Sequence, residues 1–158
     1  MFNDAKAEFE SRGIGIHYAV KANSNIHIPS LIQAQCLSVD LVSSGELSRV
    51  IAAGFSGEQM VFSGVGKIAK EFKQVIEKGV GPFNVEFAEE LELLAHIANQ
   101  QGKQVWVALR VNPNVIVNTH KNITTGAKGN KFGIDPEHAI GLYQQYYRVG
   151  NAHGFTDI

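Results

Sequence analysis

Short apolar runs recur along this chain about every 20 to 23 residues, and a helical pattern follows each run. Most of the runs are continuously apolar, which is typical of parallel strands that are buried on both faces. The regular alternation of strand and helix predicts an α/β fold with a parallel sheet, either doubly wound or built as a barrel. We expect five strands, at Ile16–Ala22, Val39–Ser43, Met60–Ser63, Phe83–Glu86 and Val105–Val111.

Residues that favour helix ends stand between these runs. Ser43 or Ser44 can cap the helix that follows the second run, because a serine hydroxyl accepts a hydrogen bond from an unpaired N–H of the first turn. Asp135 followed by Pro136 is typical of a cap and a first helical residue, and predicts a helix to about Tyr147.

The composition restricts the classes of function. The chain is 44% hydrophobic with a net charge of -1, so its overall charge gives no indication of binding to nucleic acid or to an anionic membrane. No apolar run approaches the roughly 20 residues that a membrane span needs. Cys36 is the single cysteine, which excludes an internal disulfide and favours a reducing compartment. We therefore expect a globular cytoplasmic protein.

Lys21 ends the first apolar run, just before the polar sequence Asn23-Ser24-Asn25. A lysine in such a place loses hydration, and a desolvated amine is a good nucleophile toward carbonyl groups. Active sites of barrel enzymes lie at the carboxyl ends of the strands. These points make Lys21 the first candidate catalytic residue, although such a lysine taken alone is more often an ordinary residue at a strand end.

Two other patterns have simpler interpretations. The sequence from Gly64 to Lys67 has Val61 and Ile68 where a phosphate-binding P-loop needs glycine and a hydroxyl residue, so it predicts only a strand-to-helix turn. The six histidines show no spacing of four residues and only one cysteine is present, so no zinc site is expected.

Seven short motifs follow one another along the chain: Tyr18–Asn25, Asp40–Leu47, Val61–Lys67, Phe83–Glu86, Leu109–Pro113, Thr119–Gly126 and Asn130–Ile134. In this order they resemble the diaminopimelate decarboxylases, which belong to the alanine-racemase-like group of pyridoxal-phosphate barrel enzymes. The resemblance covers about residues 14–145, and its last two motifs favour this family over ornithine or arginine decarboxylases.

The resemblance implies pyridoxal 5'-phosphate as the cofactor. Lys21 matches the lysine that carries this cofactor, and Asp40 matches a carboxylate near that lysine and the cofactor ring. Arg110 matches an arginine of the cofactor site, and the loop at 118–131 is expected near the mouth of the active site. The implied reaction removes CO2 from the D-configured centre of the amino acid meso-2,6-diaminopimelate and yields L-lysine, the last step of lysine biosynthesis, in an enzyme that is a homodimer.

The same resemblance predicts a partial fold. The family has a (β/α)8 TIM-type barrel followed by a C-terminal β domain, whereas residues 1–158 supply about five βα units and no β domain. Residues 146–158 do not resemble the expected sixth strand. We therefore expect a fragment-like, partial pyridoxal-phosphate-binding barrel domain. The alternatives are a non-catalytic barrel protein that binds the cofactor and an inactive remnant.

Overall fold

The computed structural model of the chain describes residues 2–112, 133–153 and 155–156. The strands are β1 (His17–Ala19), β2 (Ser38–Leu41), β3 (Met60–Phe62), β4 (Phe83–Val85), β5 (Val105–Leu109) and β6 (Phe155–Thr156). The helices are α1 (Phe2–Ser11), α2 (His27–Ala34), α3 (Ser44–Ala52), α4 (Ala69–Glu77), α5 (Ala88–Gln101) and α6 (Pro136–His153), with short 3-10 turns η1 (Val20–Ala22) and η2 (Gly57–Gln59). The structure confirms the five expected strands.

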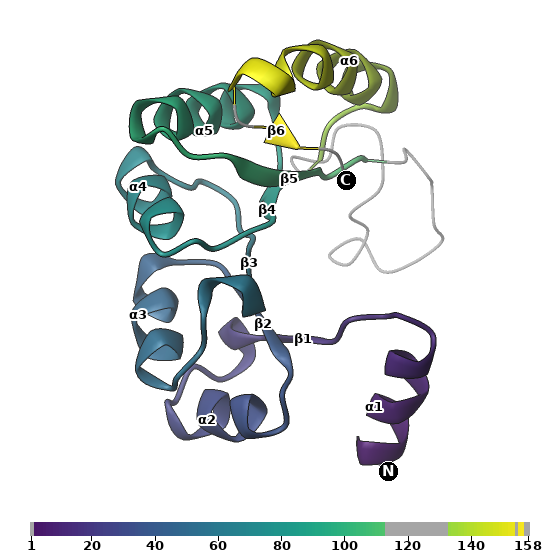
Figure 1. The fold of residues 1–158 in the computed structure, drawn as a ribbon, viewed down its shortest axis with the longest axis vertical. Coiled ribbons are helices and arrows are strands. Elements are labelled where there is room, and N and C mark those ends of the chain that lie inside the picture. Colours follow the sequence, from purple (N-terminus) through teal and green to yellow (C-terminus); the bar gives the residue numbers. More distant parts are fainter. Residues whose placement is uncertain (1, 113–132, 154, 157–158) are drawn as a thin grey trace, which may run out of the picture.

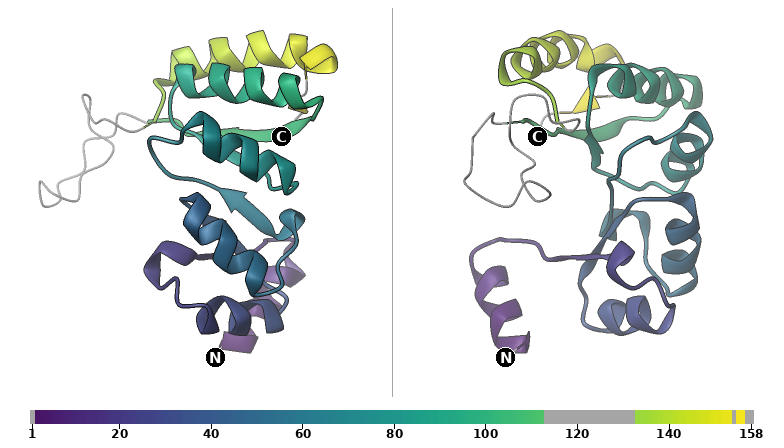
Figure 2. Two further views of the ribbon diagram at one scale, coloured as in Figure 1. Left: turned by 90° about the vertical axis from the view of Figure 1, so that its left-hand side faces the viewer. Right: turned by 180° about the vertical axis from the view of Figure 1, so that it is seen from behind.

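The six described strands form one parallel sheet in the order β1-β2-β3-β4-β5-β6. A doubly wound sheet reverses its strand order at a switch point, whereas a barrel adds each strand beside the previous one. Helices α2, α3, α4 and α5 lie together on one side of the sheet (Figure 1, Figure 2). Of the two architectures that the sequence allows, the structure therefore has the barrel type, and it forms part of such a barrel.

The hydrophobic core lies between the sheet and this layer of helices. Val39 and Leu41 of β2, Phe62 of β3 and Phe72 of α4 are completely buried. Phe83 of β4 packs edge-on against Phe62, with ring centroids 6.1 Å apart. Burial of one such side chain contributes roughly 1.5–3 kcal/mol to stability, so these residues fix which face of the sheet the helices cover.

The other face of the sheet carries polar side chains. Successive side chains of a strand point to opposite faces, so Asp40, between two core residues of β2, faces away from the helices. Asn84 has the same place in β4, between two buried neighbours. Both residues are only partly buried. The polar groups of the sheet are thus gathered on the face that the helices leave uncovered.

The helix caps follow the sequence prediction. The Ser43 hydroxyl accepts a hydrogen bond from the backbone N–H of Glu46 at 3.3 Å, and α3 begins at the next residue. Asp135 Oδ1 accepts a hydrogen bond from the backbone N–H of Glu137 at 3.1 Å, and α6 begins at Pro136. Both caps lie at the carboxyl-end side of the sheet, where they fix the loops that lead from strand to helix.

The other strands end within two residues of the sequence prediction, but two boundaries differ more. The expected strand over Ile16–Ala22 ends at Ala19, because residues 20–22 turn into η1. At the other end, the sequence predicted the last helix to about Tyr147 and no strand after it, whereas α6 continues to His153. Residues 155–156 then form β6, because the edge of β5 offers unpaired backbone groups to a following strand.

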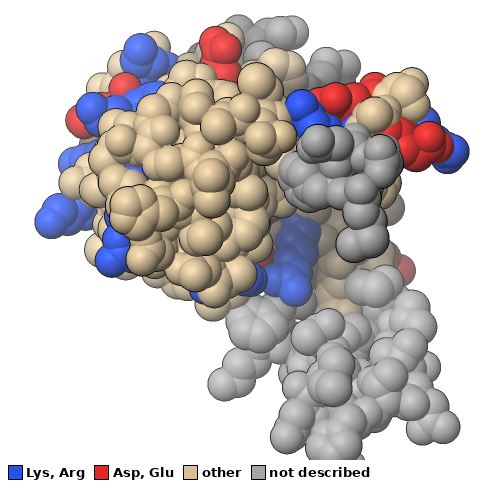
Figure 3. All heavy atoms as spheres, turned by 90° about the horizontal axis from the view of Figure 1, so that it is seen from below, with Lys and Arg blue, Asp and Glu red and all other residues tan. Residues whose placement is uncertain are grey.

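Helix α2 borders the β1 edge of the sheet and contains no Asp, Glu, Lys or Arg. Seen from below, the part of the surface around it is broad and almost free of charged side chains (Figure 3). Leu31 of α2 is 63% exposed.

Among the described residues, no helix combines the length and the apolar character that a membrane crossing requires.

Candidate functional site

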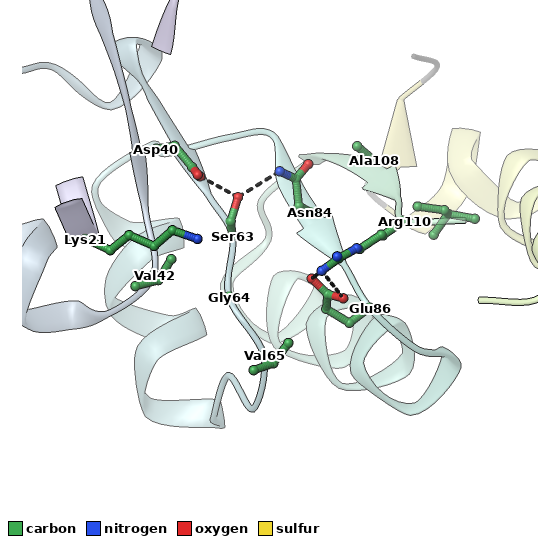
Figure 4. Close-up of a pocket in the computed structure, with 11 residues that line it drawn as sticks. Lys21, Asp40, Val42, Ser63, Gly64, Val65, Asn84, Glu86, Ala108 and Arg110 are labelled. Carbon is green, nitrogen blue, oxygen red and sulfur yellow. Dashed lines mark hydrogen bonds and ion pairs between the residues drawn. The ribbon is translucent and has the colours of Figure 1, made fainter. Parts of the chain in front are cut away.

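A pocket of about 670 Å³ opens on the polar face of the sheet, at the carboxyl ends of the strands. Side chains from η1 and from the ends of β2, β3, β4 and β5 converge on it (Figure 4). This is the edge of a barrel where active sites are found. The lining residues are Lys21, Asp40, Val42, Ser63, Gly64, Val65, Asn84, Glu86, Ala108, Leu109 and Arg110.

Lys21 extends from η1 into this pocket, toward the end of β3 (Figure 4). Buried Val20 anchors the turn, while Lys21 itself is exposed. The expectation that burial desolvates this lysine was therefore wrong, because the strand ends three residues earlier than predicted. The loop beyond it is held by hydrogen bonds from Tyr18 Oη to the carbonyl of Asn23 (3.2 Å) and from the Asn25 N–H to Asn23 Oδ1 (3.0 Å).

A chain of hydrogen bonds joins three strand ends across the pocket floor. The Ser63 hydroxyl, just after β3, donates to Asp40 Oδ1 on β2. Asn84 Nδ2 on β4 donates to the same hydroxyl oxygen at 2.8 Å. The Asp40 carboxylate is thus fixed in direction by its neighbours on the sheet, and it lies on the side of the pocket toward which Lys21 extends (Figure 4).

Arg110 and Glu86 form an ion pair on the other side of the pocket. Arg110 Nη1 donates to both carboxylate oxygens of Glu86 at 3.0 Å. The Glu86 side chain is 5% exposed and that of Arg110 is 46% exposed. Glu86 therefore anchors the guanidinium of Arg110 at the wall of the pocket.

Glutamates in the first turns of the helices fix the loops around the pocket. Glu46 Oε2 accepts a hydrogen bond from the backbone N–H of pocket residue Val42 at 2.8 Å. Glu71 of α4 accepts one from the backbone N–H of Ser44 at 3.1 Å, and so joins two successive βα loops. Carboxylates are favourable at these positions because helix N-termini carry partial positive charge.

The structure brings together all three site residues that the sequence predicted, Lys21, Asp40 and Arg110, in one pocket. The loop at 118–131 lies outside the described residues. Sequence reasoning missed Ser63, Asn84 and Glu86. Ser63 and Glu86 are the last residues of predicted strands, which is the kind of position that singled out Lys21, whereas Asn84 lies inside a predicted strand. No cluster of metal-ligating side chains is found in the part of the chain that the structure describes.

Residues 1–152 match the model of the family described as "Pyridoxal-dependent decarboxylase, pyridoxal binding domain". The chain is 44% identical over 130 residues to diaminopimelate decarboxylase of Zymomonas mobilis, and 47% identical over 126 residues to that of Pseudomonas aeruginosa. A crystal structure of diaminopimelate decarboxylase from Helicobacter pylori complexed with L-lysine superposes with a TM-score of 0.83 and 36% identity.

These matches cover most of this chain and a minor part of each relative. The match to the Zymomonas protein covers 82% of this chain and 31% of that protein, and the match to the Pseudomonas protein covers 80% of this chain and 30% of that protein. The Helicobacter structure is matched over 91% of this chain and 36% of its own chain. The chain thus spans about a third of the length of the curated relatives it matches. The chain belongs to the pyridoxal-dependent decarboxylases, and its match to that family lies in the pyridoxal-binding domain.

Proposed function

We propose that this chain forms the cofactor-binding part of a diaminopimelate decarboxylase, which uses pyridoxal 5'-phosphate to convert meso-2,6-diaminopimelate to L-lysine and CO2. The observation that carries the proposal is the shared pocket of Lys21, Asp40 and Arg110. The similarity to diaminopimelate decarboxylases of several bacteria supports the choice of substrate.

The described side chains fit this cofactor by their chemistry. Lys21 supplies a primary amine that is exposed to the pocket, as a covalent bond to an aldehyde requires. Asp40 supplies a carboxylate held in place by Ser63, and the half-exposed Arg110 supplies a cation for an anionic group. The pocket volume of about 670 Å³ lies within the range of about 300–1,000 Å³ that small-molecule sites occupy.

Pyridoxal phosphate, when bound, supplies an aldehyde that reacts with amines and a ring that accepts the electron pair left behind by departing CO2. In our proposal Lys21 Nζ would hold the cofactor through its aldehyde group. Asp40 would provide fixed negative charge on the side of the pocket toward which Lys21 extends. Arg110, anchored by Glu86, orients an anionic group of the cofactor or of the amino-acid substrate.

We also propose that the protein works in the cytoplasm as a homodimer. The exposed free thiol of Cys36 favours a reducing compartment. The dimer is a property that the family resemblance implies, and light scattering of the purified chain measures it directly.

The proposal is tested by incubating the purified chain with pyridoxal phosphate, reducing it with borohydride and mapping the labelled peptides by mass spectrometry. We expect the reduced pyridoxyl group mainly on Lys21. Lys21→Arg is the matched control, because it keeps the positive charge and removes the primary amine. Exposed Lys70 and Lys73 of α4 serve as internal references for random labelling.

Two further outcomes separate the alternatives. Uptake of label by Lys21 without release of L-lysine from meso-2,6-diaminopimelate would make the chain a cofactor-binding protein without catalysis. Equal labelling of Lys21, Lys70 and Lys73 would contradict the proposed site and favour an inactive remnant.

A further inference from the structure

Lys67 and Glu90 form a buried ion pair behind the pocket. Lys67 lies in the loop between β3 and α4, and Glu90 lies in the first turn of α5. Lys67 Nζ donates to Glu90 Oε1, and both side chains are 1% exposed. Neither residue lines the pocket itself.

The polar atoms of this pair hold the backbone of three pocket residues. Lys67 Nζ donates to the carbonyl of Gly64 at 2.7 Å and to the carbonyl of Asn84 at 2.6 Å. With the bond to Glu90, all three ammonium protons are used. Glu90 Oε2 accepts a hydrogen bond from the backbone N–H of Glu86 at 3.0 Å.

The pair is therefore hydrogen-bonded to the wall of the pocket at three backbone positions. Gly64 belongs to the loop after β3, and Asn84 belongs to β4 and holds the Ser63 hydroxyl. Glu86 follows β4 and forms the ion pair with Arg110. Loss of the pair would release both the Gly64 loop and the carboxylate that orients Arg110.

Stability alone gives little reason for such a pair. A buried ion pair can often be replaced by apolar side chains of similar size with no loss of stability, because the charges no longer have to leave water. An apolar pair could fill the same space but could not bond two carbonyls and one N–H. The specific contribution of Lys67 and Glu90 is the position of these backbone groups.

We propose that Lys67 and Glu90 are positioning residues of the pyridoxal-phosphate site, which set the Gly64 loop and, through Glu86, the direction of Arg110. This inference rests on the proposed function, but its structural part can be measured without cofactor. The geometry assigns to the pair a role in cofactor affinity, while the covalent chemistry belongs to Lys21.

The test compares the unmodified chain with the double variant Lys67→Met/Glu90→Met, which fills the space of the pair without its hydrogen bonds. The double variant Lys6→Met/Glu10→Met is the matched control, because it removes a partly exposed pair on α1, outside the pocket, whose atoms are 3.4 Å apart. Cooperative unfolding in urea establishes that each variant folds. The dissociation constant for pyridoxal phosphate is then measured by titration.

A second readout needs no cofactor. Phenylglyoxal modifies accessible arginines, so its rate at Arg110 reports how firmly Glu86 holds the guanidinium. Arg12, in a surface pair with Glu8, is the internal reference. We expect the buried double variant to bind cofactor at least tenfold more weakly and to react faster at Arg110, with Arg12 and the α1 control unchanged.

A folded Lys67→Met/Glu90→Met variant with unchanged affinity for the cofactor and unchanged Arg110 reactivity would overturn the proposal. The pair would then only fill space in the core. If the unmodified chain takes up no cofactor, the proposed function fails for this chain, and Arg110 reactivity alone decides the inference. If the double variant does not fold, Glu90→Gln takes its place, with the same two readouts and the same expected directions.

Discussion

The Ser63 hydroxyl at the end of β3 donates its proton to Asp40 Oδ1 on the neighbouring strand β2. The same hydroxyl accepts from Asn84 of β4, so its direction is set from both sides. This arrangement holds a carboxylate in one orientation before any ligand arrives. Preorganisation of this kind lowers the entropic cost of binding.

We expect Ser63→Ala to weaken pyridoxal-phosphate binding by roughly tenfold, because a lost hydrogen bond to a charged group is worth about 1.5 kcal/mol or more. Titration with the cofactor measures the effect. Ser48→Ala is the matched control, since the Ser48 hydroxyl bonds only to a helix carbonyl on an exposed face among the described contacts. Equal affinity of the two variants would contradict a role for Ser63 in fixing Asp40.

Gly64 lies in the pocket loop with φ of 98°, and a Cβ added there would lie 3.2 Å from Val42. We expect Gly64→Ala to lower the free energy of unfolding by about 2–3 kcal/mol, from strain at positive φ and from this close contact. Gly66→Ala shares the positive φ, 77°, but meets no atom within 4 Å, so it should cost only about 1 kcal/mol. Urea unfolding of both variants measures the difference, and equal losses would show that the contact with Val42 is harmless.

Ser43 caps α3 through the backbone N–H of Glu46. Ser43→Ala should lower the free energy of unfolding by about 1 kcal/mol, because this N–H loses its partner. Ser44→Ala is the control at the first residue of the helix, where alanine is well tolerated. Thermal unfolding compares the two, and a larger loss for Ser44→Ala would place the cap one residue later.

Burial, and to a smaller extent the charge of Glu92, raises the pKa of Tyr146 in α6 above its ordinary value of 10.0. The folded state therefore holds this proton more tightly than the unfolded state does. The resulting contribution to stability is complete below about pH 10 and is lost as the pH rises through the higher pKa of the folded state. We expect the unmodified chain to lose stability more steeply above pH 10 than Tyr146→Phe, in urea unfolding followed across that range. Parallel curves for the two proteins would contradict the raised pKa.

The sequence predicted the strands well because buried parallel strands carry continuous apolar runs. Lys21 was predicted from its place at the end of such a run, whereas Asp40 and Arg110 were predicted from the family resemblance. The exposure of the Lys21 side chain could not be predicted, since it depends on where β1 turns into η1. The buried pairing of Lys67 with Glu90 joins residues 23 positions apart. Both look like exposed charges until the packing of α5 against the β3–α4 loop is known.

The order of the strands has a consequence for synthesis of the protein. Each described strand after β1 pairs with the strand that precedes it in the chain. A chain that leaves the ribosome from its N-terminus therefore always finds the partner of its newest strand already made. Assembly can advance one βα unit at a time, and each new helix shields the apolar face of its own strand as it emerges, which shortens the time during which that face is open to aggregation.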